Sequence, residues 1–442
     1  MKNRPNIIFI VADDLGFADL GCYGGRDARF GRVSPVLDGL AARGVKFTQG
    51  YSNSPVCSPT RFALMTARYQ YRLRGAAEEP INSKSKGSPT LGLPSDHPTL
   101  PSLLRDSGYR TALIGKWHLG YPPAFGPLKS GYDEFIGPMS GGIDYFTHLS
   151  SAGHHDMYVG EEEKHVEGYL TDLISQRSVN YVQRMAEGAK NGAPFFLSMH
   201  YTAPHWPWET RDDEALARDL KQKITHLDGG NIHTYQRMIH HMDEGIGQVM
   251  DALRANGLAD NTLVVFTSDN GGERFSDNWP LVGGKMDLTE GGIRVPWIAH
   301  WPTVIAPGSV TTQTCMTMDW SATLLDVAGV KAHPDYPFDG VSLLRVLQNV
   351  QLSFPRPLYW RMNHRSQCAH RDGDWKYLSV DGNDYLFNIP GDERERANLA
   401  HREPERLIAM RNAWLAWNAT MPPIPLDATV SLVSSVKDMP QR

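Results

Sequence analysis

The chain has 442 residues, of which 41% are hydrophobic and 21% are charged. These values are typical of folded protein, and the length fits one large α/β domain with a smaller companion. The 44 basic and 49 acidic side chains give a formal net charge of -5, which excludes the strongly basic surface of most nucleic-acid-binding domains. No apolar run approaches the roughly 20 residues that a membrane helix needs. We therefore expect neither a nucleic acid nor a membrane as a partner.

The beginning of the sequence leads directly into a strand pattern. Residues 6–12 form a continuous apolar run rich in β-branched side chains, which is typical of a strand buried on both faces. Residues 1–5 lack the apolar stretch and cleavage site of a secretory signal. We therefore expect a cytoplasmic protein, or a periplasmic or secreted one if a signal has been trimmed from this sequence.

Strand and helix patterns alternate along the next 250 residues or so. Three more buried-strand patterns and three helical patterns lie, in chain order, at residues 98–107 (helix), 111–114 (strand), 169–188 (helix), 195–200 (strand), 234–256 (helix) and 263–268 (strand). This alternation predicts an α/β fold with a large mixed, mostly parallel sheet sandwiched by helices. The polar stretch at residues 76–97 is expected to form a long loop that serves as a lid or a pocket wall.

The character of the sequence changes near residue 345. Short strand patterns at residues 358–360, 375–380 and 385–388 are separated by Asp-Gly turns, and residues 404–417 have helical spacing. We predict a larger domain at residues 1–345 and a C-terminal α+β subdomain at residues 346–442, with an antiparallel sheet and one helix. The Pro-rich tail after Met421 is expected to wrap the body of the molecule or a neighbouring subunit of a homo-oligomer.

Polar side chains follow each of the four buried-strand patterns. They are Asp13 and Asp14, Lys116 and His118, His205, and Asp269 and Asn270. In an open parallel sheet, ligands bind outside the carboxyl ends of the strands, so these side chains are expected to meet in one site. A single Asp-Asp pair alone is as easily a solvated turn.

The acidic members of this group offer only oxygen ligands. Asp13, Asp14, Asp269 and Asn270 suit a hard cation, either calcium or magnesium, and do not suit zinc. The four cysteines form no Cys-x-x-Cys pair, which also argues against a zinc ribbon.

Cys57 begins a segment with the features of a helix N-terminus. Pro59 suits the first helical turn, where backbone N–H groups favour anions, and Arg61 follows four residues after Cys57, on the same helix face. Two other interpretations stay open at this point: a buried structural cysteine and a plain thiolate nucleophile.

These residues carry a resemblance to a known family. Cys57-Ser58-Pro59-Thr60-Arg61 resembles the Cys-x-Pro-x-Arg signature of type I sulfatases, which belong to the alkaline phosphatase superfamily. Further matches to the family pattern are Asp13-Asp14, Gly115-Lys116-Trp117-His118-Leu119-Gly120, Pro204-His205-Trp206-Pro207, Asp269-Asn270-Gly271-Gly272, Gly284-Lys285, Glu290-Gly291-Gly292 and, more weakly, residues 371–377.

The resemblance implies a modified cysteine and a bound cation. Cys57 would be converted to Cα-formylglycine by a formylglycine-generating enzyme or an anaerobic maturase. One calcium ion, or magnesium, would be held by Asp13, Asp14, Asp269 and Asn270, with the modified Cys57 beside it.

The resemblance also implies roles for the basic residues. Lys116 and Lys285 would bind sulfate oxygens, Arg61 would orient the formylglycine hydrate, His118 would contact that hydrate, and His205 would lie near the leaving oxygen. Such groups stabilise the charge of an in-line displacement at sulfur, while the hydrate provides a covalent two-step route.

The expected activity is hydrolysis of a sulfuric ester, either an aryl or a carbohydrate sulfate, by an arylsulfatase-like enzyme. Two alternatives remain: a phosphonate monoester or phosphodiester hydrolase of the same superfamily, and a non-catalytic binding relative. Aromatic, histidine and arginine side chains in loops are candidates for the pocket rim, namely His148, His154, His155, Trp206, Trp208, Arg361 and His364.

Overall fold

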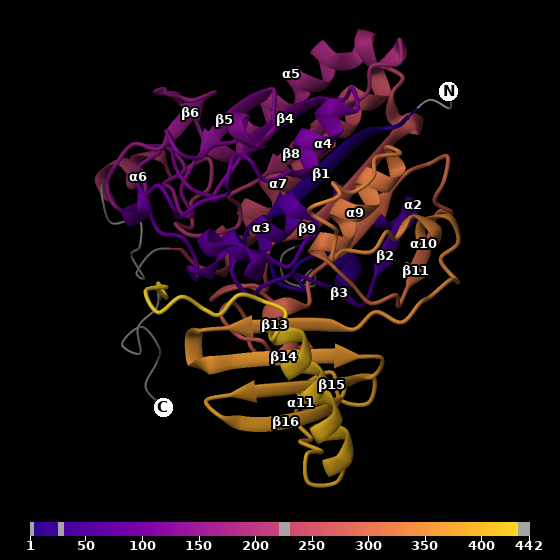
Figure 1. Cartoon of the computed structure of the whole chain (residues 1–442). Helices are drawn as coiled ribbons and strands as arrows, with labels where there is room; N and C mark the ends of the chain where they lie inside the picture. Colours follow the sequence, from indigo (N-terminus) through magenta and orange to yellow (C-terminus); the bar gives the residue numbers. More distant parts are fainter. Residues whose placement is uncertain (1–3, 25–30, 221–229, 432–442) are drawn as a thin grey trace.

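The computed structural model describes residues 4–24, 31–220 and 230–431. A twisted ten-stranded sheet forms the centre of the larger domain, and a four-stranded sheet lies below it in Figure 1. The strands of the large sheet are, in spatial order, β11 (Ser309–Thr311), β2 (Val45–Phe47), β10 (Trp297–His300), β9 (Thr262–Ser268), β1 (Asn6–Ala12), β8 (Phe195–His200), β4 (Arg110–Gly115), β5 (Glu134–Pro138), β6 (Met157–Val159) and β7 (Glu162–Glu163).

The central strands are parallel, and the outer part of the sheet contains antiparallel pairs. β1 pairs in parallel with both β8 and β9, and β4 pairs in parallel with β8 and β5. β10 runs antiparallel to β9 and β2, and β6 runs antiparallel to β5 and β7. The mixed, mostly parallel sheet predicted from the sequence is therefore confirmed.

β1 shows why the central strands are apolar on both faces. Ile8 and Ile10 belong to one core cluster, which includes residues of α2, α5 and α7. Ile7, Phe9 and Val11 belong to the opposite cluster, with residues of α3, α4, α9 and α10. Because successive side chains of a strand alternate between faces, a run without polar residues fills both cores.

Helices cover both faces of the sheet, as predicted. Those of the larger domain are α2 (Pro35–Arg43), α3 (Cys57–Thr66), α4 (Leu100–Asp106), α5 (Leu170–Lys190), α6 (Glu214–Leu220), α7 (Ile232–Ala255), α8 (Glu290–Ile293), α9 (Thr317–Val327) and α10 (Leu344–Gln348). In the described part of the chain, no helix is long and apolar enough to span a membrane.

The C-terminal part is an antiparallel sheet with one helix, as expected. Its strands are β13 (Leu358–Met362), β14 (Gln367–Asp372), β15 (Trp375–Val380) and β16 (Asn383–Asn388), and α11 (Pro404–Asn418) packs on one face. The sequence prediction missed β14. The opposite face packs against Tyr51, Val56 and Ala63 of the larger domain. A domain boundary at residue 345 stays a prediction.

Two short strands, β3 (Gly50–Tyr51) and β12 (Cys315–Met316), pair in parallel beside this junction. Trp360 of β13 donates its indole N–H to the carbonyl oxygen of Ser52 at 2.9 Å. The C-terminal sheet is therefore joined to the segment that leads into α3.

Candidate active site

The ends of four parallel strands deliver their polar side chains to one place. Asp13 and Asp14 follow β1, Lys116 follows β4, and Asp269 follows β9. His205 comes from the loop after β8. All five side chains are buried, and the contacts below join them. The convergence expected from the sequence is therefore confirmed.

The carboxylates of Asp13 and Asp14 each contact a lysine. Lys116 Nζ donates to Asp13 Oδ2, and Lys285 Nζ donates to Asp14 Oδ2 at 2.6 Å. Asn270 Nδ2 donates to Asp14 Oδ1 at 2.7 Å. Both lysines thus lie within the carboxylate cluster.

Arg61 joins α3 to the end of β9. Its Nε and a terminal nitrogen donate to Asp269 Oδ2 at 3.0 and 2.9 Å. The other terminal nitrogen donates to the carbonyl oxygen of Lys116 at 3.1 Å and lies 3.1 Å from His200 Nδ1. His200 was not among the residues predicted for the site, although its place at the end of a buried strand points to this edge of the sheet.

Cys57 is the first residue of α3 and is 2% exposed. It lines a cavity of about 690 Å³, together with His118, His205 and Lys285. Burial raises the pKa of the Cys57 thiol to about 11, although Lys116 opposes the shift. A thiolate is thereby disfavoured near neutral pH, which argues against the plain thiolate nucleophile.

The residues at the centre fit a hard cation. One ligand atom from each of Asp13, Cys57 and Asp269 lies within 4.8 Å of the others. Within the described residues, Asp13 Oδ1 and Asn270 Oδ1 are buried without a hydrogen-bond partner, although buried polar atoms are ordinarily satisfied. The oxygen atoms of Asp13, Asp269 and Asn270 favour calcium or magnesium.

The carboxylate pKa values reflect the crowding of charge. Burial and the nearby Asp269 carboxylate raise the pKa of Asp13 to about 8. Burial also opposes ionisation of Asp14, but Lys285 and His205 outweigh it and hold the pKa of Asp14 below its ordinary value. A divalent cation at this position would favour the ionised form of both carboxylates.

Backbone contacts orient the two histidines of the cavity. His118 Nε2 lies 2.6 Å from the carbonyl oxygen of Ile81. A carbonyl only accepts, so Nε2 carries the proton. Burial and Lys116 lower the pKa of His118, so the neutral ring has a free lone pair on Nδ1, which has no partner among the described residues.

In His205 the nitrogen that contacts a backbone carbonyl is Nδ1, whereas in His118 it is Nε2. Its Nδ1 lies 2.6 Å from the carbonyl oxygen of Trp206, and its Nε2 lies 3.5 Å from Asp14 Oδ2. Burial and Lys285 lower the pKa of His205. Nε2 is therefore the nitrogen that faces the carboxylate cluster.

Local backbone geometry supports this arrangement. Asp14 and His118 both have φ near 61°, a left-handed conformation that is uncommon outside glycine and recurs at functional sites. Gly115 precedes Lys116 with φ 114°, and a Cβ there would lie 1.9 Å from the carbonyl oxygen of His200. Only glycine allows β4 to approach the end of β8 this closely.

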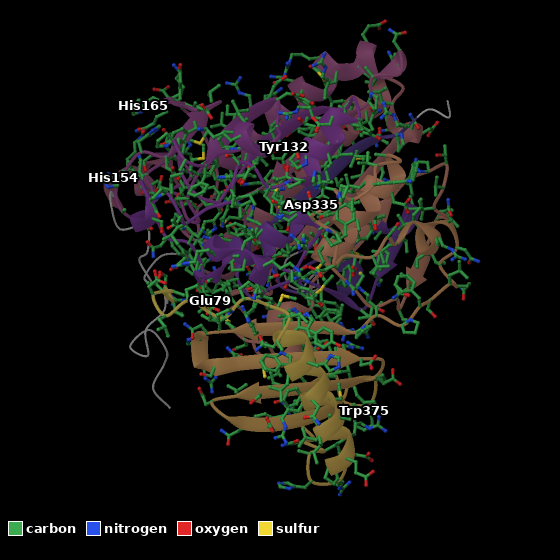
Figure 2. All side chains as sticks on the ribbon, viewed as in Figure 1. Glu79, Tyr132, His154, His165, Asp335 and Trp375 are labelled. Carbon is green, nitrogen blue, oxygen red and sulfur yellow. The ribbon has the colours of Figure 1, made fainter. Side chains whose placement is uncertain are left out.

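The cavity wall differs in part from the sequence expectation. The predicted loop at residues 76–97 does supply Pro80 to Ser83, and Trp206 also lines the cavity. The other six rim candidates do not. Arg361 lines a separate cavity, and Trp208 packs edge-to-face on Phe275. Figure 2 shows His154 at the periphery of the molecule.

His148, His155 and His364 complete the set of rim candidates that do not line the cavity. The cavity wall contains Glu273 and Ser431, which the sequence analysis did not select. Glu273 lies 3.7 Å from Lys285 Nζ. No local sequence signal identifies Ser431, because its position depends on the path of the tail.

Comparison with known proteins relates this site to a family. The sequence model of the family described as Sulfatase matches residues 5–330. The N-acetylgalactosamine-6-sulfatase of Mus musculus is 33% identical over 377 residues, covering 80% of this chain and 68% of the relative. Arylsulfatase J of Mus musculus is 30% identical, with 96% of this chain and 77% of the relative covered.

A solved structure shows the same similarity in three dimensions. The crystal structure of Ps i-CgsB has a TM-score of 0.82 and 32% sequence identity, and the match covers 94% of this chain and 92% of that chain. A second crystal structure of Ps i-CgsB is a complex with k-i-k-neocarrahexaose.

Proposed function

The chain belongs to the sulfatase family and is a sulfatase enzyme, and from this premise we propose that it cleaves its ester with a formylglycine made from Cys57, beside a divalent cation. The observation that carries the proposal is the position of Cys57. It lies at the start of a buried helix, beside the carboxylate cluster and at the wall of the cavity.

The modification would supply a nucleophilic hydroxyl from an aldehyde hydrate, a group that an unmodified thiol cannot replace. Arg61 lies one helical turn after residue 57 and is fixed by Asp269, so it would orient that hydroxyl. Lys116 and Lys285 would bind the sulfate oxygens. Their ammonium groups are held in place by the carboxylates of Asp13 and Asp14. Fixed positive charges of this kind stabilise the charge that develops during displacement.

The two histidines suit opposite proton transfers. The lone pair on His118 Nδ1 would accept the proton of the second hydroxyl. The leaving oxygen would be protonated by the Lys285 ammonium, or by His205 Nε2 from the imidazolium form that the nearby Asp14 carboxylate favours. A positioned acid or base of this type contributes roughly 10²- to 10⁴-fold to the rate.

Asp13, Asp14, Asp269 and Asn270 would hold the cation, and calcium suits their oxygen atoms best. The cation would supply Lewis-acid stabilisation of a sulfate oxygen. The buried atoms Asp13 Oδ1 and Asn270 Oδ1 support this assignment, because neither has a partner within the described residues.

We propose a saccharide sulfate as the substrate. One relative is named for N-acetylgalactosamine 6-sulfate, and the structure at 32% identity was solved with k-i-k-neocarrahexaose. The cavity of about 690 Å³ is much larger than a sulfate group, so it can also hold part of a sugar.

The first test is the mass of the peptide that contains residue 57. The protein is made with and without a formylglycine-generating enzyme, and the Cys57→Ala variant is the control. An aldehyde or its hydrate, present only when the activating enzyme is supplied, is the expected result. An unmodified thiol under these conditions would contradict the proposed nucleophile.

The second test compares sulfate esters with phosphonate and phosphodiester substrates on the modified enzyme. We expect a higher kcat/KM for sulfate esters. A reversed preference would favour the superfamily alternative, and zero turnover of every ester by fully modified protein would contradict the proposed catalysis.

A further inference from the structure

A short C-terminal segment returns to the cavity. After α11, the chain runs beside β13, along the boundary between the C-terminal sheet and the larger domain (Figure 1). We call residues 427–431 the C-terminal strap. Ser431, the last residue of the strap, lines the same cavity as Cys57. The cavity wall therefore includes a segment that lies outside the part of the chain matched by the family model.

Backbone pairing fixes the position of the strap. Val430 forms a parallel β-bridge with Glu79. The backbone N–H of Glu79 donates to the carbonyl oxygen of Thr429 at 3.0 Å, and the N–H of Ser431 donates to the carbonyl oxygen of Glu79 at 3.0 Å. Figure 2 shows Glu79 where the C-terminal sheet meets the larger domain. The two backbone hydrogen bonds to Glu79 set the register of the strap, and this register places Ser431 at the cavity.

Side chains strengthen this attachment. The buried Glu78 carboxylate accepts from the backbone N–H of Thr429 at 2.8 Å and from the Thr429 hydroxyl. Arg74 forms ion pairs with Glu78 at 2.8 Å and with Asp427 at 3.1 Å. The exposed Asp427 pair contributes little by itself, but the buried Glu78 bonds tie the strap to one geometry.

The segment that holds the strap also contacts the catalytic residues. The N–H of Ile81 donates to Ser58 Oγ at 2.9 Å, next to Cys57. His118 Nε2 donates to the carbonyl oxygen of Ile81. Asn82 Nδ2 then donates to Ser431 Oγ at 2.9 Å. The strap is thus connected to His118 through two adjacent residues: Asn82 contacts Ser431, and Ile81 contacts His118.

Uncharged polar side chains form part of the cavity wall. Asn82 contacts Ser431, and Ser83 and Ser151, whose hydroxyl oxygens lie 3.5 Å apart, line the same cavity, which also contains Glu273, Arg274 and Lys285. Trp206 and Phe275 add aromatic surface to the same cavity. Hydroxyl-binding groups together with aromatic faces match the two kinds of surface that a sugar ring presents.

Resting on the proposed function, we infer that the C-terminal strap determines specificity: Ser431 and Asn82 bind hydroxyl groups of the saccharide that carries the sulfate ester. A small aryl sulfate has no hydroxyl groups to place against them. Loss of the strap therefore lowers activity on a sulfated sugar far more than activity on an aryl sulfate.

A matched pair of truncations tests the inference. One variant ends at Ser431 and keeps the strap, and the other ends at Leu426 and lacks it. Each formylglycine-containing enzyme is assayed with 4-nitrophenyl sulfate and with N-acetylgalactosamine 6-sulfate. Removing the strap should lower kcat/KM for the sugar by about tenfold or more and for the aryl ester by less than about threefold, as expected for one or two lost hydrogen bonds.

Point variants give the same comparison without shortening the chain. Ser431→Ala should lower kcat/KM for the sugar ester roughly two- to tenfold, the effect of one hydrogen bond. Leu426→Ala is the control, because the Leu426 side chain is fully exposed beside the strap. Equal losses on both esters, or equal losses in both truncations, would overturn the inference.

Binding separates this inference from the proposed function. The Kd of N-acetylgalactosamine 6-sulfate and of k-i-k-neocarrahexaose is measured by calorimetry on the Cys57→Ala protein, with and without the strap. Hydrolysis of the aryl ester by the modified enzyme without strap-dependent binding of either sugar would overturn the inference alone. Strap-dependent binding without turnover of any ester by that enzyme would support the inference and contradict the proposed catalysis.

Discussion

Arg61 connects three strand ends through one side chain. Its guanidinium group donates to Asp269 and to the carbonyl oxygen of Lys116, and it lies beside His200. The side chain is 1% exposed, so these bonds form in a region from which water is largely excluded. A lysine has one compact ammonium group and cannot reproduce the planar fork of arginine.

We predict that Arg61→Lys keeps the fold but lowers kcat on 4-nitrophenyl sulfate roughly a hundredfold, because one preorganised contact to the reacting group is lost. Arg72→Lys is the matched control. Arg72 likewise donates two hydrogen bonds to one carboxylate, that of Asp339, but this pair is partly exposed and contains no residue of the carboxylate cluster. Similar kcat losses in both variants would indicate that Arg61 has only a structural role.

The position of His205 predicts an effect that depends on the leaving group. We expect His205→Ala to reduce kcat/KM about a hundredfold or more for alkyl and sugar sulfates, but less than about tenfold for 4-nitrophenyl sulfate, whose leaving oxygen needs little protonation. The measurement is a series of esters with leaving groups of graded pKa. An unchanged dependence on leaving-group pKa would contradict proton donation by His205.

At the residue scale, the placement of the motif residues could be predicted from the sequence, whereas the residues that line the cavity rim could not. Cys57 and Arg61 share a helix, so their spacing already placed them on one side. His154 and Arg361 are in segments whose path is set by distant packing, and neither lines the cavity. Local spacing carries no information about such long-range contacts.

At the element scale, the C-terminal sheet is linked to the larger domain by buried charges. Lys376 of β15 contacts Glu290 of α8 at 3.0 Å and Glu395 at 2.8 Å. All three side chains are at most 1% exposed. Burial raises the pKa of Glu395 to about 7, although Lys376 opposes that shift. The positive charge of Lys376 therefore offsets part of the free-energy cost of burying the carboxylates of Glu290 and Glu395.

We predict that Lys376→Met lowers the free energy of unfolding by about 3–5 kcal/mol, because it leaves the buried Glu395 carboxylate without its cation, while Glu290 keeps Arg294 and Arg371 at 3.6 and 3.7 Å. Denaturant unfolding measures the change. The control is Arg184→Met, whose pair with Glu134 is about half-exposed and should contribute less than about 1 kcal/mol. Equal losses in the two variants would refute a special role for the buried pair.

Element prediction succeeded where hydrophobic runs were long. β1 and β8 match their predicted bounds, and β9 and β4 differ by only one or two residues at their ends. The short strand β2 and the four-residue β10 were missed, because three or four residues do not establish a period. β14 contains His370 and Arg371, buried polar residues that obscure its strand pattern.

At the scale of the whole molecule, the fold concentrates unlike charges at one sheet edge. Asp13, Asp14 and Asp269 are buried together with Lys116 and Arg61. Segments more than 100 residues apart must meet before these charges are compensated, as in the pairing of Lys116 with Asp13, 103 residues apart, and of Arg61 with Asp269, 208 residues apart. A cation bound at this point would stabilise only the folded chain, so its affinity should be visible in the melting temperature.

We predict that calcium at about 100 times its Kd stabilises the folded protein by about 2.7 kcal/mol, which raises Tm by a few degrees. Differential scanning calorimetry with calcium, with magnesium and with a chelator measures the effect without any turnover. Asp269→Ala should abolish the calcium-dependent shift, whereas Asp335→Ala should retain it, because the Asp335 side chain is exposed. A shift of equal size in both variants would place the cation elsewhere, and no shift in the unmutated protein would contradict the metal site. A larger shift with magnesium would keep the site but change the identity of its ion.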